Sequence, residues 1–166
     1  MNLRISTAGP LALAAMLTAL AAPTASAQTN SLNVMGSIGG HGIGVVQAGI
    51  LQASGGGSGN ASQIGRFTYV MHATVSPAAI PGTGTSTGVF LLVFSNGDVI
   101  HGTFTGENLS VDRILERLTI EGGTGRFQGA SGSLTLERRL DLTTLPAFES
   151  HTGTLTGTIT TPSLAK

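Results

Sequence analysis

The chain has no cysteine and no tryptophan among its 166 residues, and its aromatic residues are six phenylalanines and one tyrosine. Without cysteine the protein has no disulfide, no thiol nucleophile and no cysteine-ligated metal. Only 10% of the residues are charged, and eight basic residues balance eight acidic ones. A nucleic-acid-binding surface needs an excess of basic residues, so this composition argues against a nucleic-acid partner.

Residues 1–27 have the three parts of a secretory signal peptide: one early basic residue, an apolar run, and an Ala-Ser-Ala cleavage site. The apolar run covers about 15 residues, whereas roughly 20 are needed to span a bilayer. No later apolar stretch is long enough either, so no membrane span is expected. We predict a secreted or periplasmic protein, cleaved after Ala27, with a single domain over 28–166.

The remainder of the chain has the period of two that is typical of β-strands. The pattern is clearest over 152–160, where threonine occupies every even position and glycine, leucine or isoleucine every odd one. Leu155 and Ile159 are therefore expected to face a core, and Thr154, Thr156 and Thr158 to face solvent.

Eight strands are expected, because clusters of glycine, proline and asparagine interrupt the alternation at intervals. The Gly-rich tract 55–60 is interpreted as a flexible loop, and Asn96-Gly97 as a tight hairpin turn. Residues 111–118 fit both a strand and a short helix, and their β-rich surroundings favour the strand. The expected strands lie near 31–38, 42–52, 62–76, 87–95, 98–106, 114–121, 131–141 and 150–161.

Eight consecutive antiparallel strands favour an all-β closed barrel, with a β-sandwich as the alternative, because closure removes both sheet edges. Glycines at 102, 106, 153 and 157 share the parity of apolar residues and are expected to point inward. Small inward residues either let the wall coil tightly or leave space for a guest. A barrel of this size is either filled by side chains or holds one small ligand.

Two charged residues share strand faces with aliphatic residues, and these faces point either into the barrel or toward a solvated rim. Glu116 shares its face with three aliphatic residues, so a carboxylate there is a candidate general acid or base. Arg138 has a similar position, and an inward Arg is a natural partner for it. Together with Tyr69 and Phe104, Arg138 is a candidate ligand contact. The alternatives are that both charges lie at a solvated rim and that Tyr69 packs in the core.

Two other kinds of site are not supported. The histidines at 41, 72, 101 and 151 lack the close spacing of a metal site and are interpreted as separate surface or rim residues, so no metal is expected. The Gly-Thr-Gly sequence at 123–125 is followed by strand-like alternation instead of a helix that would hold a phosphate.

Residues 88–94 are apolar on both strand faces: one face has Val89, Leu91 and Val93, and the other has Phe90, Leu92 and Phe94. A barrel in water needs one apolar face. The second face is therefore expected to be covered by a subunit interface or a packed loop.

The sequence Ile-Glu-Gly-Gly-Thr-Gly-Arg-Phe-Gln-Gly-Ala-Ser-Gly at 120–132 resembles a stretch shared by plant dirigent proteins, allene oxide cyclases and many small exported bacterial proteins. The resemblance implies a calycin-like barrel with a central cavity, and often a homotrimer. The cyclases close an allylic epoxide into a cyclopentenone, and the dirigent proteins guide radical coupling. The motif itself has a structural role, which we assign to Gly122, Gly123, Thr124, Gly125, Phe127, Gly129 and Gly132.

Three functions follow from these observations. The favoured one is a barrel that binds a small, largely apolar molecule in its cavity. The second is a cofactor-free isomerase or cyclase in which Glu116 transfers a proton. The third is a structural barrel with a filled core. None of the three requires a cofactor.

Overall fold

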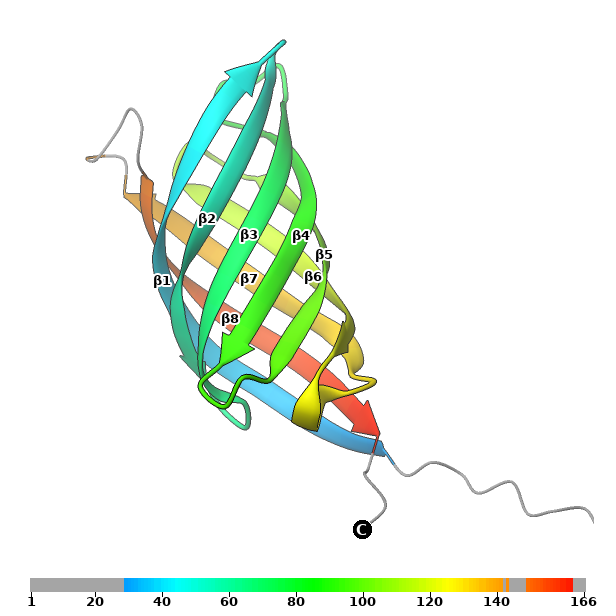
Figure 1. The fold of residues 1–166 in the computed structure, drawn as a ribbon. Coiled ribbons are helices and arrows are strands. Elements are labelled where there is room, and N and C mark those ends of the chain that lie inside the picture. Colours follow the sequence, from blue (N-terminus) through cyan, green and yellow to red (C-terminus); the bar gives the residue numbers. More distant parts are fainter. Residues whose placement is uncertain (1–28, 142, 144–148, 163–166) are drawn as a thin grey trace, which may run out of the picture.

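A computed structural model describes residues 29–141, 143 and 149–162, so the expected signal peptide and its cleavage site lie outside the described residues. The described chain is a closed barrel (Figure 1) in which each strand pairs antiparallel with the next and β8 pairs with β1. This confirms the eight-stranded barrel over the sandwich. No helix in the described part is long and apolar enough to cross a membrane. The strands are β1 (Thr29–Gln47), β2 (Ile50–Ala61), β3 (Gly65–Pro77), β4 (Gly84–Phe94), β5 (Val99–Asn108), β6 (Arg113–Gly123), β7 (Ser131–Asp141) and β8 (Glu149–Pro162), with a 3-10 turn η1 (Gly125–Phe127) between β6 and β7.

The up-and-down order gives the barrel two distinct ends. The connections 48–49, 78–83 and 109–112 lie at one end, which we call the polar end. The connections 62–64, 95–98 and 124–130 lie at the other, the motif end. The start of β1 and the finish of β8 also lie at the motif end, because Thr29 pairs with Pro162.

The alternation expected for the last strand is present. Leu155 and Ile159 are buried, whereas Thr154 and Thr156 are exposed. Inward aliphatic and aromatic residues from the other strands join them in one core that fills the middle of the barrel. A cavity of only about 10 Å³ remains there. That volume is at the lower limit for a single water molecule.

The Gly-rich tract is not a loop, and this prediction is wrong. It forms the middle of β2, paired with β1 on one side and β3 on the other. The prediction failed because glycine has low strand propensity and shows no apolar period. Its absent side chains allow close approach here: a Cβ on Gly57 would collide with the carbonyl oxygen of Gly39.

The strand expected over 42–52 is also wrong, because a hairpin turn divides it. Gln47 pairs with Ile50 across a two-residue turn. Both turn residues have positive φ, 51° at Ala48 and 79° at Gly49. This is the requirement of a type I′ turn, whose twist matches that of the flanking strands. An alanine in the first turn position gave no turn signal in the sequence.

The glycine motif lies at the motif end of the barrel, in the connection between β6 and β7. Gly125 and Gly129 adopt positive φ, and between them the buried Phe127 turns inward. The Thr124 hydroxyl accepts a hydrogen bond from the Val99 amide, and the Arg126 guanidinium lies 4.5 Å from the centre of the Phe127 ring. The segment that follows is strand β7 and not a helix, and the structural role assigned to the motif residues stays a prediction.

Two further local expectations hold, and one stays open. Residues 113–123 form strand β6, and Gly97 has the positive φ of a tight turn. The second apolar face of β4 lies on the outside of the barrel, with Val89 and Leu91 exposed. Its burial in an oligomer stays a prediction.

We expect Leu155→Ala to lower the free energy of unfolding by about 2–5 kcal/mol, because it leaves a hole in a core with almost no free volume. Thr156→Ala, on the outer face of the same strand, should change it by less than about 0.5 kcal/mol. Urea denaturation monitored by circular dichroism measures both. Equal losses would contradict the assigned register.

A second test concerns the Gly-rich strand. Gly57→Ala should lower the free energy of unfolding by roughly 1–3 kcal/mol, since the new methyl group meets backbone that cannot move aside. Ser58→Ala, at the exposed neighbouring position, is the matched control and should stay close to wild type. A flexible loop would tolerate both changes equally, so similar midpoints in urea would argue against a paired β2.

Candidate functional site

A charged pair lies inside the barrel near its polar end. Glu116 is fully buried on β6, and Arg138 comes from the neighbouring strand β7. The Arg138 Nε and Nη2 atoms donate to the two Glu116 oxygens at 2.9 and 2.7 Å. The inward pairing expected from strand parity is therefore confirmed. Because both carboxylate oxygens are engaged, Glu116 holds the guanidinium plane in one orientation.

The pair continues into a cluster that includes residues of β8, the neighbour of β7, and of β3. Glu149 Oε1 lies 3.6 Å from Arg138 Nη1 and 3.7 Å from His151 Nδ1. The other ring nitrogen of His151, Nε2, lies 2.6 Å from the Tyr69 hydroxyl. One chain of polar contacts, which we call the polar cluster, thus joins Tyr69, Glu116, Arg138, Glu149 and His151.

Burial sets the protonation states within the polar cluster. Desolvation, with the positive charge of Arg138, lowers the pKa of His151 to about 4, and desolvation raises the pKa of Tyr69 to about 12. Burial also raises the pKa of Glu149, against the opposing attraction of Arg138. Burial disfavours the charge on Arg138, but the attraction and hydrogen bonds of Glu116 outweigh it and raise the pKa of Arg138. At neutral pH the imidazole is neutral and the phenol is protonated.

These states assign the hydrogens of the histidine ring. If Nδ1 carries the proton, the N–H group faces the Glu149 carboxylate, and Nε2 accepts a hydrogen bond from the Tyr69 hydroxyl. The other tautomer would direct a lone pair at that carboxylate. The favourable tautomer therefore leaves His151 Nδ1–H as a donor toward the interior of the polar end.

Glycines on β1 and β2 provide the space for the polar cluster. A Cβ on Gly40 would collide with the Tyr69 hydroxyl, and one on Gly42 would lie 2.8 Å from Glu149 Oε1. Tyr69 on β3 and His151 on β8 are separated by these two strands, and the missing side chains let them meet. The Gly-rich composition of β1 and β2 is thus a requirement of the site.

Several buried polar atoms at this end lack a hydrogen-bond partner among the described residues. They are His151 Nδ1, Ser86 Oγ, Asn108 Oδ1 and Arg113 Nε, and all four residues lie in strand segments next to the polar end. Buried polar atoms are normally paired, and leaving one unpaired costs about 1–3 kcal/mol. Their concentration at one end indicates where a polar group of a ligand would gain most.

The structure separates the predicted site residues. Tyr69, Glu116 and Arg138 meet in the polar cluster, whereas Phe104 packs in the middle of the core over Gly88. The prediction that all four histidines lie at the surface or rim is wrong for His151, which is only 3% exposed. His151 lies four residues before Leu155 on the same strand, so it shares the inward face of Leu155. This alternation is the sequence signal that could have identified His151 as buried. Within the described residues, no group of three or more His, Asp or Glu side chains can hold a metal ion.

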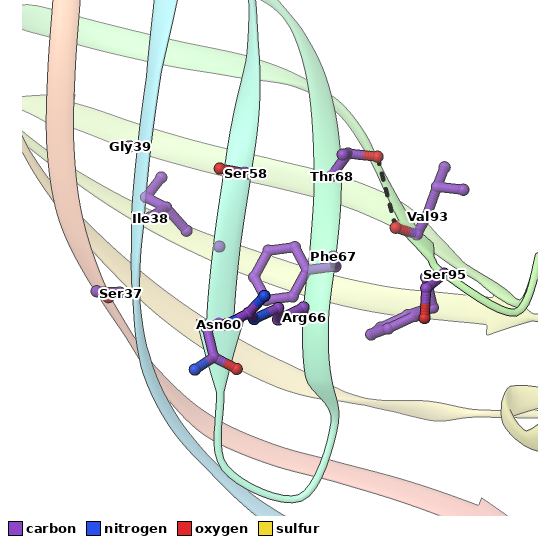
Figure 2. Close-up of a pocket in the computed structure, with 12 residues that line it drawn as sticks. Ser37, Ile38, Gly39, Ser58, Asn60, Arg66, Phe67, Thr68, Val93 and Ser95 are labelled. Atoms are coloured by element: carbon purple, nitrogen blue, oxygen red, sulfur yellow. Dashed lines mark hydrogen bonds between the residues drawn. The ribbon is translucent and has the colours of Figure 1, made fainter.

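A groove of about 690 Å³ lies on the outer wall across β1 to β4, toward the motif end (Figure 2). Its exposed side chains include Ser58, Asn60 and Arg66, and Thr68 Oγ1 donates to the Val93 carbonyl at 3.5 Å. None of the buried unpartnered atoms belongs to this lining. The polar end is therefore the stronger candidate site.

The depressed pKa of His151 makes stability dependent on pH. In the unfolded chain, His151 is protonated below its ordinary pKa of 6.5. In the folded protein, the same ring is protonated only below about pH 4. The free energy of unfolding should therefore fall by about 3 kcal/mol as the pH drops through this window. The raised pKa of Glu149 acts in the opposite direction, because the folded state gains that proton first.

Variants distinguish the two contributions in urea denaturation at a series of pH values. His151→Gln should flatten the loss below pH 6.5, and Glu149→Gln should steepen it. His72→Gln, at an exposed position on the outer wall, should follow wild type. Because Glu149 opposes His151 in the wild type, the deciding curve is that of Glu149→Gln: no loss of stability in this window would show that His151 is not buried in its neutral form.

A scan against protein-family models finds no match to this chain, and a search of curated proteins finds no relative. The resemblance of residues 120–132 to the dirigent and allene oxide cyclase stretch therefore stays a prediction. The case for function depends on the geometry of the polar end.

Proposed function

We propose that the protein binds a small, largely apolar molecule that carries one neutral oxygen group, such as a hydroxyl or carbonyl, at the polar end of the barrel. The observation that carries the proposal is the buried, unpartnered Nδ1 atom of His151. A second buried and unpartnered group, the Ser86 hydroxyl, lies on β4 toward the same end of the barrel. A few placed polar groups in an otherwise apolar surround are the usual layout of a small-molecule site.

The apolar part of such a ligand has matching surroundings. Ile114 is buried on the inward face near this end, and Leu51, Val75 and Leu140 are half-buried there. The small cavity in the middle of the barrel leaves no room for a guest at that level. The proposed position is consequently the end of the barrel, with the oxygen group toward His151 and the hydrocarbon against these side chains.

The charge of the polar cluster favours a neutral ligand over an anion. Two carboxylates, Glu116 and Glu149, surround the single guanidinium of Arg138, and His151 is neutral near pH 7. An added carboxylate would face excess negative charge. A neutral hydroxyl or carbonyl accepts from His151 without that repulsion.

A cofactor-free isomerase is the second candidate, and the contact of Tyr69 with His151 favours it. A neutral imidazole is able to polarise a ligand carbonyl by donating a hydrogen bond from Nδ1–H, and the Tyr69 hydroxyl on Nε2 holds the ring in the tautomer that this requires. Both oxygens of Glu116 are bound to Arg138, so its role in this scheme is to position Arg138. Loss of Glu116 alone would leave a buried charge unpaired, at a cost of about 3–5 kcal/mol, so His151 is the better residue to test.

The binding proposal is tested with octanol, octanoate and octylamine, which share one hydrocarbon chain and differ in the head group. Nuclear magnetic resonance titrations give the three affinities at neutral pH. Octanol should bind most tightly, and His151→Phe should weaken octanol binding roughly tenfold through the lost hydrogen bond. His101→Phe, at an exposed position on the outer wall, is the matched control and should bind as wild type does.

The outcomes are distinct. A preference for octanoate or octylamine would contradict the neutral ligand. No binding of any probe to a folded wild type would favour the structural barrel with a filled core. Equal effects of His151→Phe and His101→Phe would move the site away from the polar cluster.

A further inference from the structure

Exposed apolar side chains lie on three described connections at the polar end of the barrel. Eleven large hydrophobic residues are exposed in the described part of the chain, and seven of them lie at this end. Four are at the tip of the β1–β2 hairpin, Ile80 is in the 78–83 connection, and Leu109 and Val111 are in the 109–112 connection. We call these seven residues the apolar crown. The turn at the motif end between β4 and β5 is Ser-Asn-Gly-Asp, so the two ends differ in character.

The apolar crown carries almost no charge. The hairpin tip over 42–53 and the connection 78–83 contain no charged residue. The third connection has one carboxylate, Asp112, which accepts a hydrogen bond from the Ser110 hydroxyl. Exposed or half-buried charges of both signs follow at the adjacent strand ends, namely Glu107, Arg113, Arg139 and Asp141, so this end presents no excess of one sign to a surface that covers it. Neutral lipid headgroups suit such an end, whereas anionic lipids would require an excess of basic residues to gain from their charge.

The hairpin tip is suited to the boundary between headgroups and acyl chains. Figure 1 shows it projecting beyond the rest of the barrel, and its strands pair with each other as far as Gln47 and Ile50. Paired backbone groups lower the cost of leaving water. Among the described residues, the pairing of β8 with β1 stops at Gly42, and none of them pairs with the outer edge of 43–47.

We propose that the apolar crown docks the polar end of the barrel onto the surface of a neutral phospholipid bilayer. The crown is divided among three separate connections, and a fluid surface adapts to separate tips. A protein partner would be expected to meet one contiguous, shape-complementary face. The docked barrel directs the polar cluster toward the lipid. The docking does not depend on the proposed ligand, because the crown residues and the polar cluster are different groups.

The test is flotation of the purified protein with vesicles of phosphatidylcholine alone, without any added ligand. Val46→Glu and Ile80→Glu place a charge in two different connections of the crown. Each should lower the bound fraction roughly tenfold, since a carboxylate must then be desolvated at the interface. Met35→Glu is the matched control: Met35 is 72% exposed at the motif end, against 70% for Val46. It should float as wild type does.

Three further readouts make the result decisive. Residues 1–27 have an apolar run of their own, so only variants that share those residues are compared. Thermal melts should coincide, because all three positions are exposed. Binding that requires anionic lipid or disappears at high salt, or an equal loss in Met35→Glu, would overturn the proposal. So would a wild-type oligomer that Val46→Glu dissociates while vesicles bind neither protein, since a second copy would then cover the crown.

Discussion

The narrow interior of an eight-stranded barrel is the constraint on which the rest of this structure depends. Eight strands enclose about enough room for one layer of side chains, so a large inward residue needs a small one opposite. The chain meets this requirement with glycine: the Phe67 ring lies where a Cβ of Gly59 would be, and Phe104 lies over Gly88 in the same way. The core is therefore a set of aromatic and aliphatic groups fitted against bare backbone, and the wall bends around them.

The pairing of large inward side chains with glycine also explains how a charged cluster fits inside so small a barrel. Glu116 and Arg138 are neighbours on adjacent strands, but Tyr69 and His151 come from strands separated by β1 and β2. Glycine in those two strands brings the phenol and the imidazole together. Burying charge is costly, and the two hydrogen bonds between Glu116 and Arg138 offset that cost. The remaining polar atoms are left to solvent or a ligand at one end.

The sequence predicted the parts of this structure that strand alternation determines. Alternation placed Leu155 inward, and it placed Glu116 and Arg138 on the aliphatic faces of two neighbouring strands. A register error of one residue would have turned every side chain of a strand to the opposite face. Alternation failed at Gly55–Asn60, where residues without side chains have no period to observe. His151 lies on the same strand face as Leu155, but histidine is more often a surface residue in proteins, and that preference predicts a position at the surface. Its contact with Tyr69 spans 82 positions and depends on closure of the barrel, which no local pattern contains.

The seam between β1 and β8 makes the fold a ring. Thr29 and Pro162 are paired neighbours at the motif end, so a short linker between them would add one more hairpin connection to the seven already there. The chain could then be opened at another tight turn, such as the one at Asn96-Gly97, with all eight strand pairings kept. Circular permutation therefore changes the order in which the strands are made without changing the wall they build. Any such permutant opened at the motif end keeps both chain ends on the side of the barrel opposite the polar cluster.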